Sequence, residues 1–294
     1  MVKNNSILYK ILILLVLIFV GSIIFMLLNL GVISIYGDRV LTNIGILKTL
    51  QVIYQILAFF LPVLIFYKIT NYSLVNDLGL KRKEKSTVIL FIIVLYVVTI
   101  PLINWTTEIN SQIEIPRFLG SLKTWFLEQE KQAVELTFKF LNTSSVIGIL
   151  TNIVVLALVP AVAEELLFRG CIQKILTDNV KYPHLGVIIS SLIFSIAHFQ
   201  FSGIIPRFIL GLILGYIFYY THNIKLSMLF HFLNNVIAVL IAFVGINYFN
   251  YTAEDLNSST EFSNVTLALL SIVLIVFILR YIFKNANRQS EITD

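Results

Sequence analysis

Side chains capable of acid–base chemistry lie inside apolar stretches of the second half of this chain. They are Glu164, Glu165, Arg169, His198 and His231, with the amide of Asn235 nearby. A charge at the middle of a membrane helix costs about 2.5–3.5 kcal/mol even on translocon-based scales. The apolar stretches of the first half contain essentially no such group. Because these costly groups gather in one half, we expect them to serve a function.

The first cluster is Glu164-Glu165, followed by Arg169. Residues four apart lie on one face of a helix, so the spacing predicts an ion pair between Glu165 and Arg169. Pairing lowers the cost of burying both charges. Glu164 is turned by about 100° from Glu165, which leaves it without the arginine. The cluster thus predicts one neutralised glutamate beside a free, reactive one, although the pair itself could serve only to pack two helices.

Two further pairs each share a helical face: Phe194 with His198, and His231 with Asn235. Taken singly, such histidines and amides often pack, cap or hold membrane helices together. With Glu164 they supply what peptide hydrolysis needs: a base for water, a proton donor for the leaving amine and donors for the oxyanion. Glu164, His198 and His231 also match a known catalytic zinc set, so bare and metal-bound water both remain open.

Other catalytic motifs are absent from the sequence. It contains neither the H-E-x-x-H of helical zinc peptidases nor the G-x-S-x-G of a serine elbow. The single cysteine, Cys171, excludes a disulfide framework and a cysteine-type zinc site. Nothing around Cys171 indicates a nucleophile, so we interpret it as a small packing residue.

The composition indicates that these residues are positioned by membrane helices. Of 294 residues, 58% are hydrophobic and 13% charged, whereas a soluble domain carries roughly 25% charged residues. The net charge of +5 comes mainly from short loops between apolar runs. No basic face with interleaved aromatic residues is present, so we exclude nucleic acid as a partner and expect a lipid bilayer instead.

Hydropathy predicts an all-α polytopic membrane protein of about eight spans around an intramembrane polar cavity, since a span takes about 20 residues. We divide the chain into N-terminal helices and an interfacial segment at 1–143, a catalytic core at 144–250, and a last helix with a polar tail at 251–294. The predicted spans are 10–35, 48–68, 86–104, 144–166, 184–200, 204–221, 225–247 and 262–283.

Loop charges predict the orientation. With eight spans, the basic residues fall on one side and the acidic loops on the other, which places both termini in the cytoplasm. The segment 118–141 is either an amphipathic interfacial helix or a linker helix. Helical rise predicts that His198 and His231 differ in depth by about 10 Å or more. The residues used for the orientation are Lys81, Arg82, Lys83, Lys85, Lys174, Lys181, Lys225, Arg280, Lys284 and Arg288, against Glu108, Glu114, Glu128, Glu130, Glu135, Glu254, Asp255 and Glu261.

The ordered motifs E-E-x-x-x-R, F-x-x-x-H and H-x-x-x-N on successive predicted spans resemble the CPBP family. This family comprises CAAX prenyl protease type 2 and bacteriocin-processing intramembrane proteases, and is also called the Abi family. The resemblance covers about residues 145–250 and implies an all-helical membrane fold, a conical cavity open to the cytoplasm and endopeptidase activity. The motif residues are Glu164, Glu165, Arg169, Phe194, His198, His231 and Asn235.

The resemblance also implies roles. Glu164 is the expected base for water, assisted by His198, and His231 and Asn235 are the expected oxyanion donors. The name "metalloprotease" persists in the family beside a glutamate-dependent mechanism; we favour a reaction that requires no cofactor, with zinc as the alternative. The expected supporting residues are Glu165, Arg169 and Phe194.

The resemblance implies a membrane-bound peptide or protein substrate: a lipidated C-terminus, a bacteriocin or pheromone leader, or a signalling protein. A composition rich in Ile, Lys and Asn indicates an AT-rich bacterial genome, which favours a bacterial plasma membrane and argues against a literal CAAX substrate. The alternatives are a non-catalytic bacteriocin-immunity or membrane peptide-binding protein, and a transporter, which the absence of an internal repeat disfavours.

Overall fold

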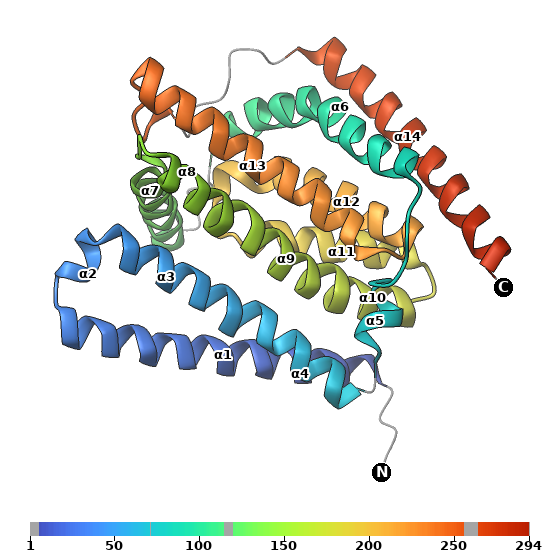
Figure 1. Ribbon diagram of the computed structural model, residues 1–294, viewed down its shortest axis with the longest axis horizontal. Coiled ribbons are helices and arrows are strands. Elements are labelled where there is room, and N and C mark those ends of the chain that lie inside the picture. The colour runs from blue at the N-terminus through green and yellow to red at the C-terminus, as the bar shows by residue number, and fades with distance from the viewer. Residues whose placement is uncertain (1–5, 71, 115–119, 256–263, 294) are drawn as a thin grey trace.

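The computed structural model of the chain describes residues 6–70, 72–114, 120–255 and 264–293. Every regular element in these ranges is helical, which confirms the predicted all-α class (Figure 1). The helices are α1 (Ile7–Tyr36), α2 (Arg39–Thr42), α3 (Ile44–Gln55), α4 (Leu61–Thr70), α5 (Leu74–Asp77), α6 (Ser86–Ser111), α7 (Ser121–Leu141), α8 (Val146–Asn152), α9 (Val159–Glu165), α10 (Lys174–Asn179), α11 (Pro183–Ile196), α12 (Ile204–Thr221), α13 (Ile224–Phe249) and α14 (Val265–Thr293).

Within the described ranges, seven helical stretches are long and apolar enough to cross a membrane. The fifth predicted span, 184–200, is the shorter helix α11, whose 14 residues extend about 21 Å, less than the hydrocarbon thickness of about 30 Å. The last prediction began at 262, and positions 262 and 263 lie outside the described residues. The protein is therefore a multi-pass membrane protein, with these spans: Ile7–Tyr36, Ile44–Thr70, Ser86–Ser111, Val146–Asn179, Phe201–Thr221, Ile224–Phe249 and Val265–Asn285.

Two of the spans are helices interrupted by π-helical turns. The segment Ile56–Phe60 joins α3 to α4, and the segments Ile153–Leu158 and Leu166–Gln173 lie on either side of α9. Pro62 and Pro160 explain the first two, because a proline lacks an N–H and its ring clashes with the carbonyl four residues earlier. In both cases that carbonyl lies inside the π-helical segment, which accommodates the proline without ending the helix.

The fourth span is longer than the sequence predicted. We expected it to end at residue 166, but the helix continues through α10 to Asn179, so that Glu164 lies near its middle. It then turns back into α11, and α11 packs against α12. An added Cβ on Gly211 of α12 would lie 3.1 Å from the Cβ of Ser191, so a glycine is what allows these two helices to approach so closely.

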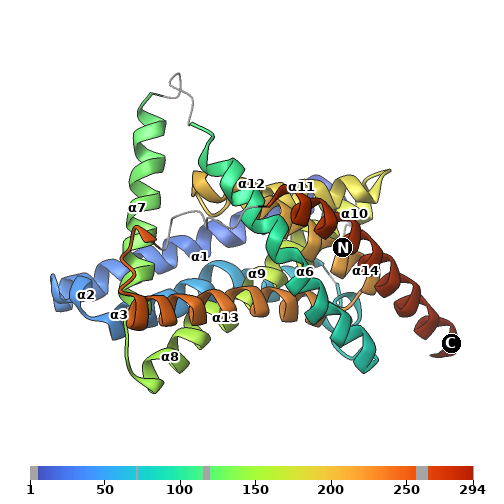
Figure 2. The same cartoon turned by 90° about the horizontal axis from the view of Figure 1, so that it is seen from above.

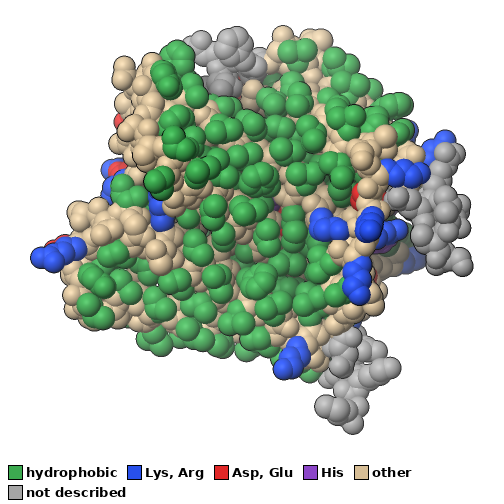
Figure 3. Space-filling model, in the orientation of Figure 1, with side chains coloured by type: hydrophobic (Ala, Val, Ile, Leu, Met, Phe, Trp, Pro, Cys, Tyr) green, Lys and Arg blue, Asp and Glu red, His purple; other side chains and the backbone are tan. Residues whose placement is uncertain are grey.

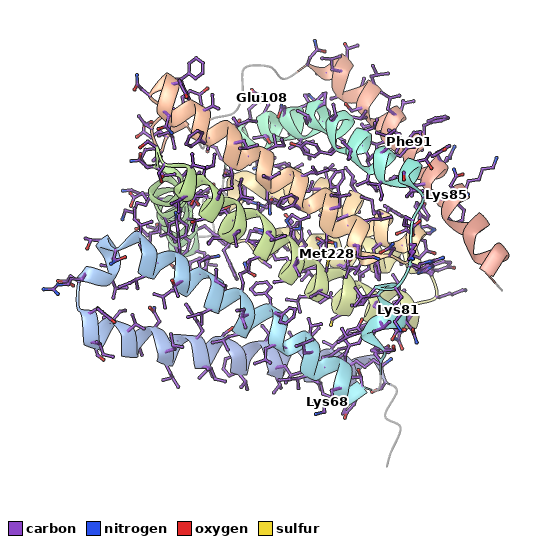
Figure 4. All side chains as sticks on the ribbon, viewed as in Figure 1. Lys68, Lys81, Lys85, Phe91, Glu108 and Met228 are labelled. Atoms are coloured by element: carbon purple, nitrogen blue, oxygen red, sulfur yellow. The ribbon has the colours of Figure 1, made fainter. Side chains whose placement is uncertain are left out.

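The molecular surface is apolar over most of one face, with lysine and arginine gathered mainly toward one edge (Figure 3). Large apolar side chains such as Phe19 and Ile35 are exposed on α1, as expected where a helix contacts lipid rather than water. The labelled Lys68, Lys81 and Lys85 lie toward one end of the helices, whereas Glu108 lies toward the other end of α6 (Figure 4).

The basic loops meet at a single end of the helical bundle. Lys225 donates from Nζ to the carbonyls of Leu80 and Arg82, and Lys174 forms an ion pair with Asp77. The first turn of α1 and the last turn of α14 lie at this same end (Figure 1). This arrangement agrees with the predicted segregation of charge between the two sides of the membrane.

Helix α7 stands apart from the other long helices and projects away from them (Figure 2). It covers the predicted amphipathic segment from Ser121 to Leu141; Phe118, where that prediction began, lies outside the described residues. The ring centroid of Trp125 on α7 lies 5.8 Å from that of Phe199, and the buried Glu130 accepts a hydrogen bond from Ser202. Helix α7 therefore packs on the loop that follows α11.

Candidate active site

The two adjacent glutamates lie in the middle of the fourth span, between two π-helical segments. Glu164 and Glu165 end α9, with Ile153–Leu158 before it and Leu166–Gln173 immediately after it. π-Helical turns inside α-helices occur frequently at functional sites, where they change which side chains face inward. Here they bracket the most acidic point of an otherwise apolar span.

Glu165 is fully buried and held by two charged or polar partners. Arg169 donates from Nη1 to its Oε1 over 2.9 Å, and the Nδ1 of His231 lies 2.9 Å from the same oxygen. Arg169 also donates from Nη2 to the carbonyl of Gly211 on α12. The predicted ion pair between Glu165 and Arg169 is therefore present, and it ties α9 to α12 and α13.

Glu164 has looser surroundings. Its Oε2 lies 3.9 Å from Nε2 of His198 and 3.9 Å from Nε2 of His231, while its Oε1 accepts from Nε2 of Gln55 over 3.4 Å. Among the described residues, Arg169 forms its ion pair with Glu165 alone, as helical geometry predicted. The side chain of Glu164 keeps 12% of its surface exposed.

His198 lies in the turn after α11, and its orientation is fixed by Phe194. The ring Nδ1 lies 2.8 Å from the carbonyl oxygen of Phe194. Because a carbonyl oxygen only accepts, Nδ1 must carry the proton, so in the neutral ring the lone pair is on Nε2, which faces Glu164. The φ of 51° at Phe199 is the backbone conformation that turns the chain away after this histidine.

The ring of Phe194 packs among three motif residues. Its centroid lies 4.9 Å from the ring of His198, 5.9 Å from that of His231 and 4.5 Å from Cζ of Arg169. The Phe194 side chain is 1% exposed. Phe194, which the sequence suggested as a supporting residue, is therefore the apolar wall against which both imidazoles and the guanidinium rest.

The prediction that His198 and His231 differ in depth by about 10 Å or more is wrong. An equal number of residues separates Glu164 from Asn179 and His198 from Pro183, so the helical hairpin brings both to one level. Helix α13 starts beside Gly170, which lies well before the end of the fourth span at Asn179. The error arose from assuming that all helices start at one plane.

Asn235 lies one turn beyond His231 on α13 and is half-buried. Its Oδ1 accepts from Nδ2 of Asn234 over 3.2 Å. In the described part of the chain, no hydrogen bond links Asn235 to Glu164, His198 or His231. The structure thus brings six of the seven motif residues into direct contact and leaves Asn235 at the margin of the cluster.

Two buried polar residues of α3 were missed from the sequence. Gln55, on α3, contacts Glu164, and Lys48, on the same helix, is buried with its Nζ 5.8 Å from the Phe140 ring centroid. The expectation that spans of the first half contain essentially no ionisable group is therefore wrong for Lys48. A signal was available: Lys48, Gln51 and Gln55 are spaced by three and four residues and form a polar stripe on one helical face.

Cys171 is fully buried within an apolar cluster that includes Phe168 and Phe218, as its interpretation as a packing residue predicted. The three side chains considered for zinc, Glu164, His198 and His231, have suitable donor types. However, the described residues contain no group of three or more His, Cys, Asp or Glu side chains placed to hold a metal ion.

Comparison with known proteins agrees with the motifs. The family model described as type II CAAX prenyl endopeptidase, Rce1-like, matches residues 146–237. This segment contains Glu164, Glu165, Arg169, His198 and His231. No curated protein and no solved structure matches the chain. The resemblance to CAAX proteases that the ordered motifs predicted is therefore confirmed, and it covers residues 146–237 of this multi-pass membrane protein.

Proposed function

We propose that this protein is an intramembrane endopeptidase in which Glu164 activates water. The observation that carries the proposal is that Oε2 of Glu164 lies 3.9 Å from Nε2 of both His198 and His231. At 3.9 Å neither histidine forms a direct hydrogen bond with the carboxylate, but one water molecule can donate to the carboxylate and to the bare Nε2 of His198 together. The match to an endopeptidase family supports a peptide bond as the target.

In the proposed reaction, Glu164 accepts one proton and later returns it. Glu164 takes a proton from water while the water oxygen bonds to the scissile carbonyl carbon, and the carbonyl oxygen becomes an oxyanion. Glu164 then returns the proton to the amide nitrogen as the C–N bond breaks. A positioned general base typically contributes about 10²–10⁴-fold to the rate.

His231 is the proposed oxyanion donor, helped by Asn235. Because its Nδ1 donates to Glu165, Nε2 can donate only if the ring carries both protons. In the proposed arrangement the imidazolium of His231 lies between the carboxylates of Glu165 and Glu164. In this arrangement Glu165 stabilises the imidazolium that faces the oxyanion.

The proposed substrate is a membrane-associated or lipidated peptide or protein. An apolar groove of about 270 Å³ lies beside Glu164 between the second and fourth spans, and it suits an apolar segment or a lipid chain. We further propose that the lysine-rich end of the bundle, with both termini, faces the cytoplasm of a bacterium. The groove is lined by Gln55, Ile56, Phe60, Leu158, Val159, Val162 and Ala163.

The test is proteolysis by the full-length protein in liposomes, on a library of membrane-anchored peptides with and without lipid modification. Wild type is compared with Glu164→Gln and with Glu128→Gln, a matched change at an exposed position on α7. We expect cleavage by wild type and Glu128→Gln and none by Glu164→Gln. Full activity of Glu164→Gln would refute the assignment of the base. Peptide binding without cleavage in all three proteins would favour the non-catalytic immunity or peptide-binding function.

A further inference from the structure

We propose that Gln55 is a positioning residue for Glu164: its side-chain amide holds one carboxylate oxygen so that the other faces the two histidines. The inference rests on the proposed role of Glu164 as the base. Gln55 ends α3 and is 4% exposed. It lies outside residues 146–237, so the family match assigns it no role.

The contacts of Glu164 divide between its two oxygens. Oε1 accepts from Nε2 of Gln55 over 3.4 Å, whereas Oε2 lies 3.9 Å from each histidine Nε2. In the part of the chain that the structure describes, the bond from Gln55 is the one direct hydrogen bond to this carboxylate. The terminal torsion of a glutamate is soft, so a bond to one oxygen determines where the other points.

A second buried glutamine shows what a purely structural role looks like in this protein. Gln173 is 1% exposed; its Nε2 donates to the carbonyl of Gly215, and its Oε1 accepts from Ser190. Both ends of that amide are satisfied, and it joins the fourth span to α11 and α12. At Gln55 the donor is directed to Glu164, while Oε1 is buried without a hydrogen-bond partner among the described residues.

The backbone around Gln55 is also distorted in the same way as that around Glu164. The π-helical segment Ile56–Phe60 begins directly after Gln55, and another begins two residues after Glu164. Pro62 accounts for the first of these. The two spans thus both depart from regular α-helix where the amide and the carboxylate meet.

The test separates positioning from packing by using changes of nearly constant size. Gln55→Met keeps length but removes the donor, Gln55→Glu keeps shape but replaces the donor with an acceptor, and Gln55→His retains an N–H at a similar reach. Gln51→Met, one turn earlier on the same face and half-buried, is the matched control. Each full-length variant is reconstituted in liposomes, and kcat and KM are measured per folded molecule with the peptide that wild type cleaves.

We expect Gln55→Met and Gln55→Glu to lower kcat by roughly 10- to 100-fold, because misplacing a catalytic group by about 1 Å can cost 10²-fold. Gln55→His should recover most of kcat, and Gln51→Met should match wild type. Wild-type kcat in Gln55→Met, alongside an inactive Glu164→Gln, would overturn this inference while leaving the proposed function intact. If Glu164→Gln is itself active, the proposed function fails first.

Discussion

The two adjacent glutamates of α9 have opposite surroundings. Glu165 is fully buried, and its Oε1 lies 2.9 Å from Nη1 of Arg169 and 2.9 Å from Nδ1 of His231. Glu164 keeps 12% of its side chain exposed, and its nearest polar atoms lie 3.4–3.9 Å away. One residue of helical rotation therefore separates a carboxylate that holds helices together from one whose Oε2 has no direct hydrogen bond within the described residues.

The difference between the two carboxylates follows from how the cluster holds its buried charges. A buried charge is tolerated when it is paired and hydrogen-bonded. The pair between Glu165 and Arg169 fulfils this condition on one face and so fixes the helix on which Glu164 stands. His231 lies between the two carboxylates, with Nδ1 toward Glu165 and Nε2 toward Glu164, and so links the buried ion pair to Glu164.

The largest expected effect is the loss of activity on replacing Glu164. Glu164→Gln keeps size and polarity, so we expect activity to fall by about 10²–10⁴-fold, the contribution of a general base, with no change in folded yield or thermal unfolding. Turnover of the cleaved peptide and a thermal unfolding curve on the same preparation provide the check. A variant that loses activity only because it unfolds at a lower temperature would break the contrast between the two glutamates.

The next largest effect is expected on the stability contributed by the pair of Glu165 and Arg169. Arg169→Ala leaves Glu165 buried without its cation, which should lower the free energy of unfolding by about 3–5 kcal/mol. Folded yield and activity should then fall together, measured by size-exclusion chromatography in detergent and by peptide cleavage. Arg280→Ala, at an exposed arginine of α14, is the control. Normal yield with normal activity for Arg169→Ala would contradict the supporting role of the pair.

A variant at His231 should show both effects at smaller size. His231→Asn removes a hydrogen bond to a charged carboxylate, which is worth about 1.5–3 kcal/mol, and also the proposed oxyanion donor. We expect a moderate drop in thermal stability together with a loss of kcat. His184→Asn, at an exposed histidine in the first turn of α11, should change neither quantity. Loss of stability without loss of kcat would show that His231 has a structural role only.

The smallest effect is expected from chelators. Because we propose that Glu164 and His198 activate water without a metal, treatment with a zinc chelator should leave cleavage largely unchanged. Metal content by mass spectrometry and activity before and after treatment give the check. Inhibition that added zinc reverses would establish the metal-bound alternative and give Glu164 the role of a ligand.

Regular periodicity made the local features predictable. The spacing of Glu165 and Arg169 predicted their ion pair, since four residues make about one helical turn. The same rotation predicted that Glu164 would be left without the arginine. Hydropathy located the long spans, because about 20 apolar residues are needed to cross a bilayer.

The misses share a cause. Helix α11, one of the eight candidate spans, has only 14 residues, and the two histidines were predicted at different depths but meet at one carboxylate. Hydropathy reports how apolar a segment is, not how deep its first residue lies. That depth is determined by how neighbouring helices pack, as the contact of Ile224 with Gly170 illustrates.

The sequence by itself determined the membrane setting, the helical class and the pairing on α9, because these depend on composition and on neighbours three or four residues apart. Only the tertiary structure decided that His198 and His231 converge on one oxygen of Glu164, and that Gln55 from a distant span binds the other. These contacts join residues far apart in the chain. They depend on where each helix starts, turns and widens, and no local spacing encodes that.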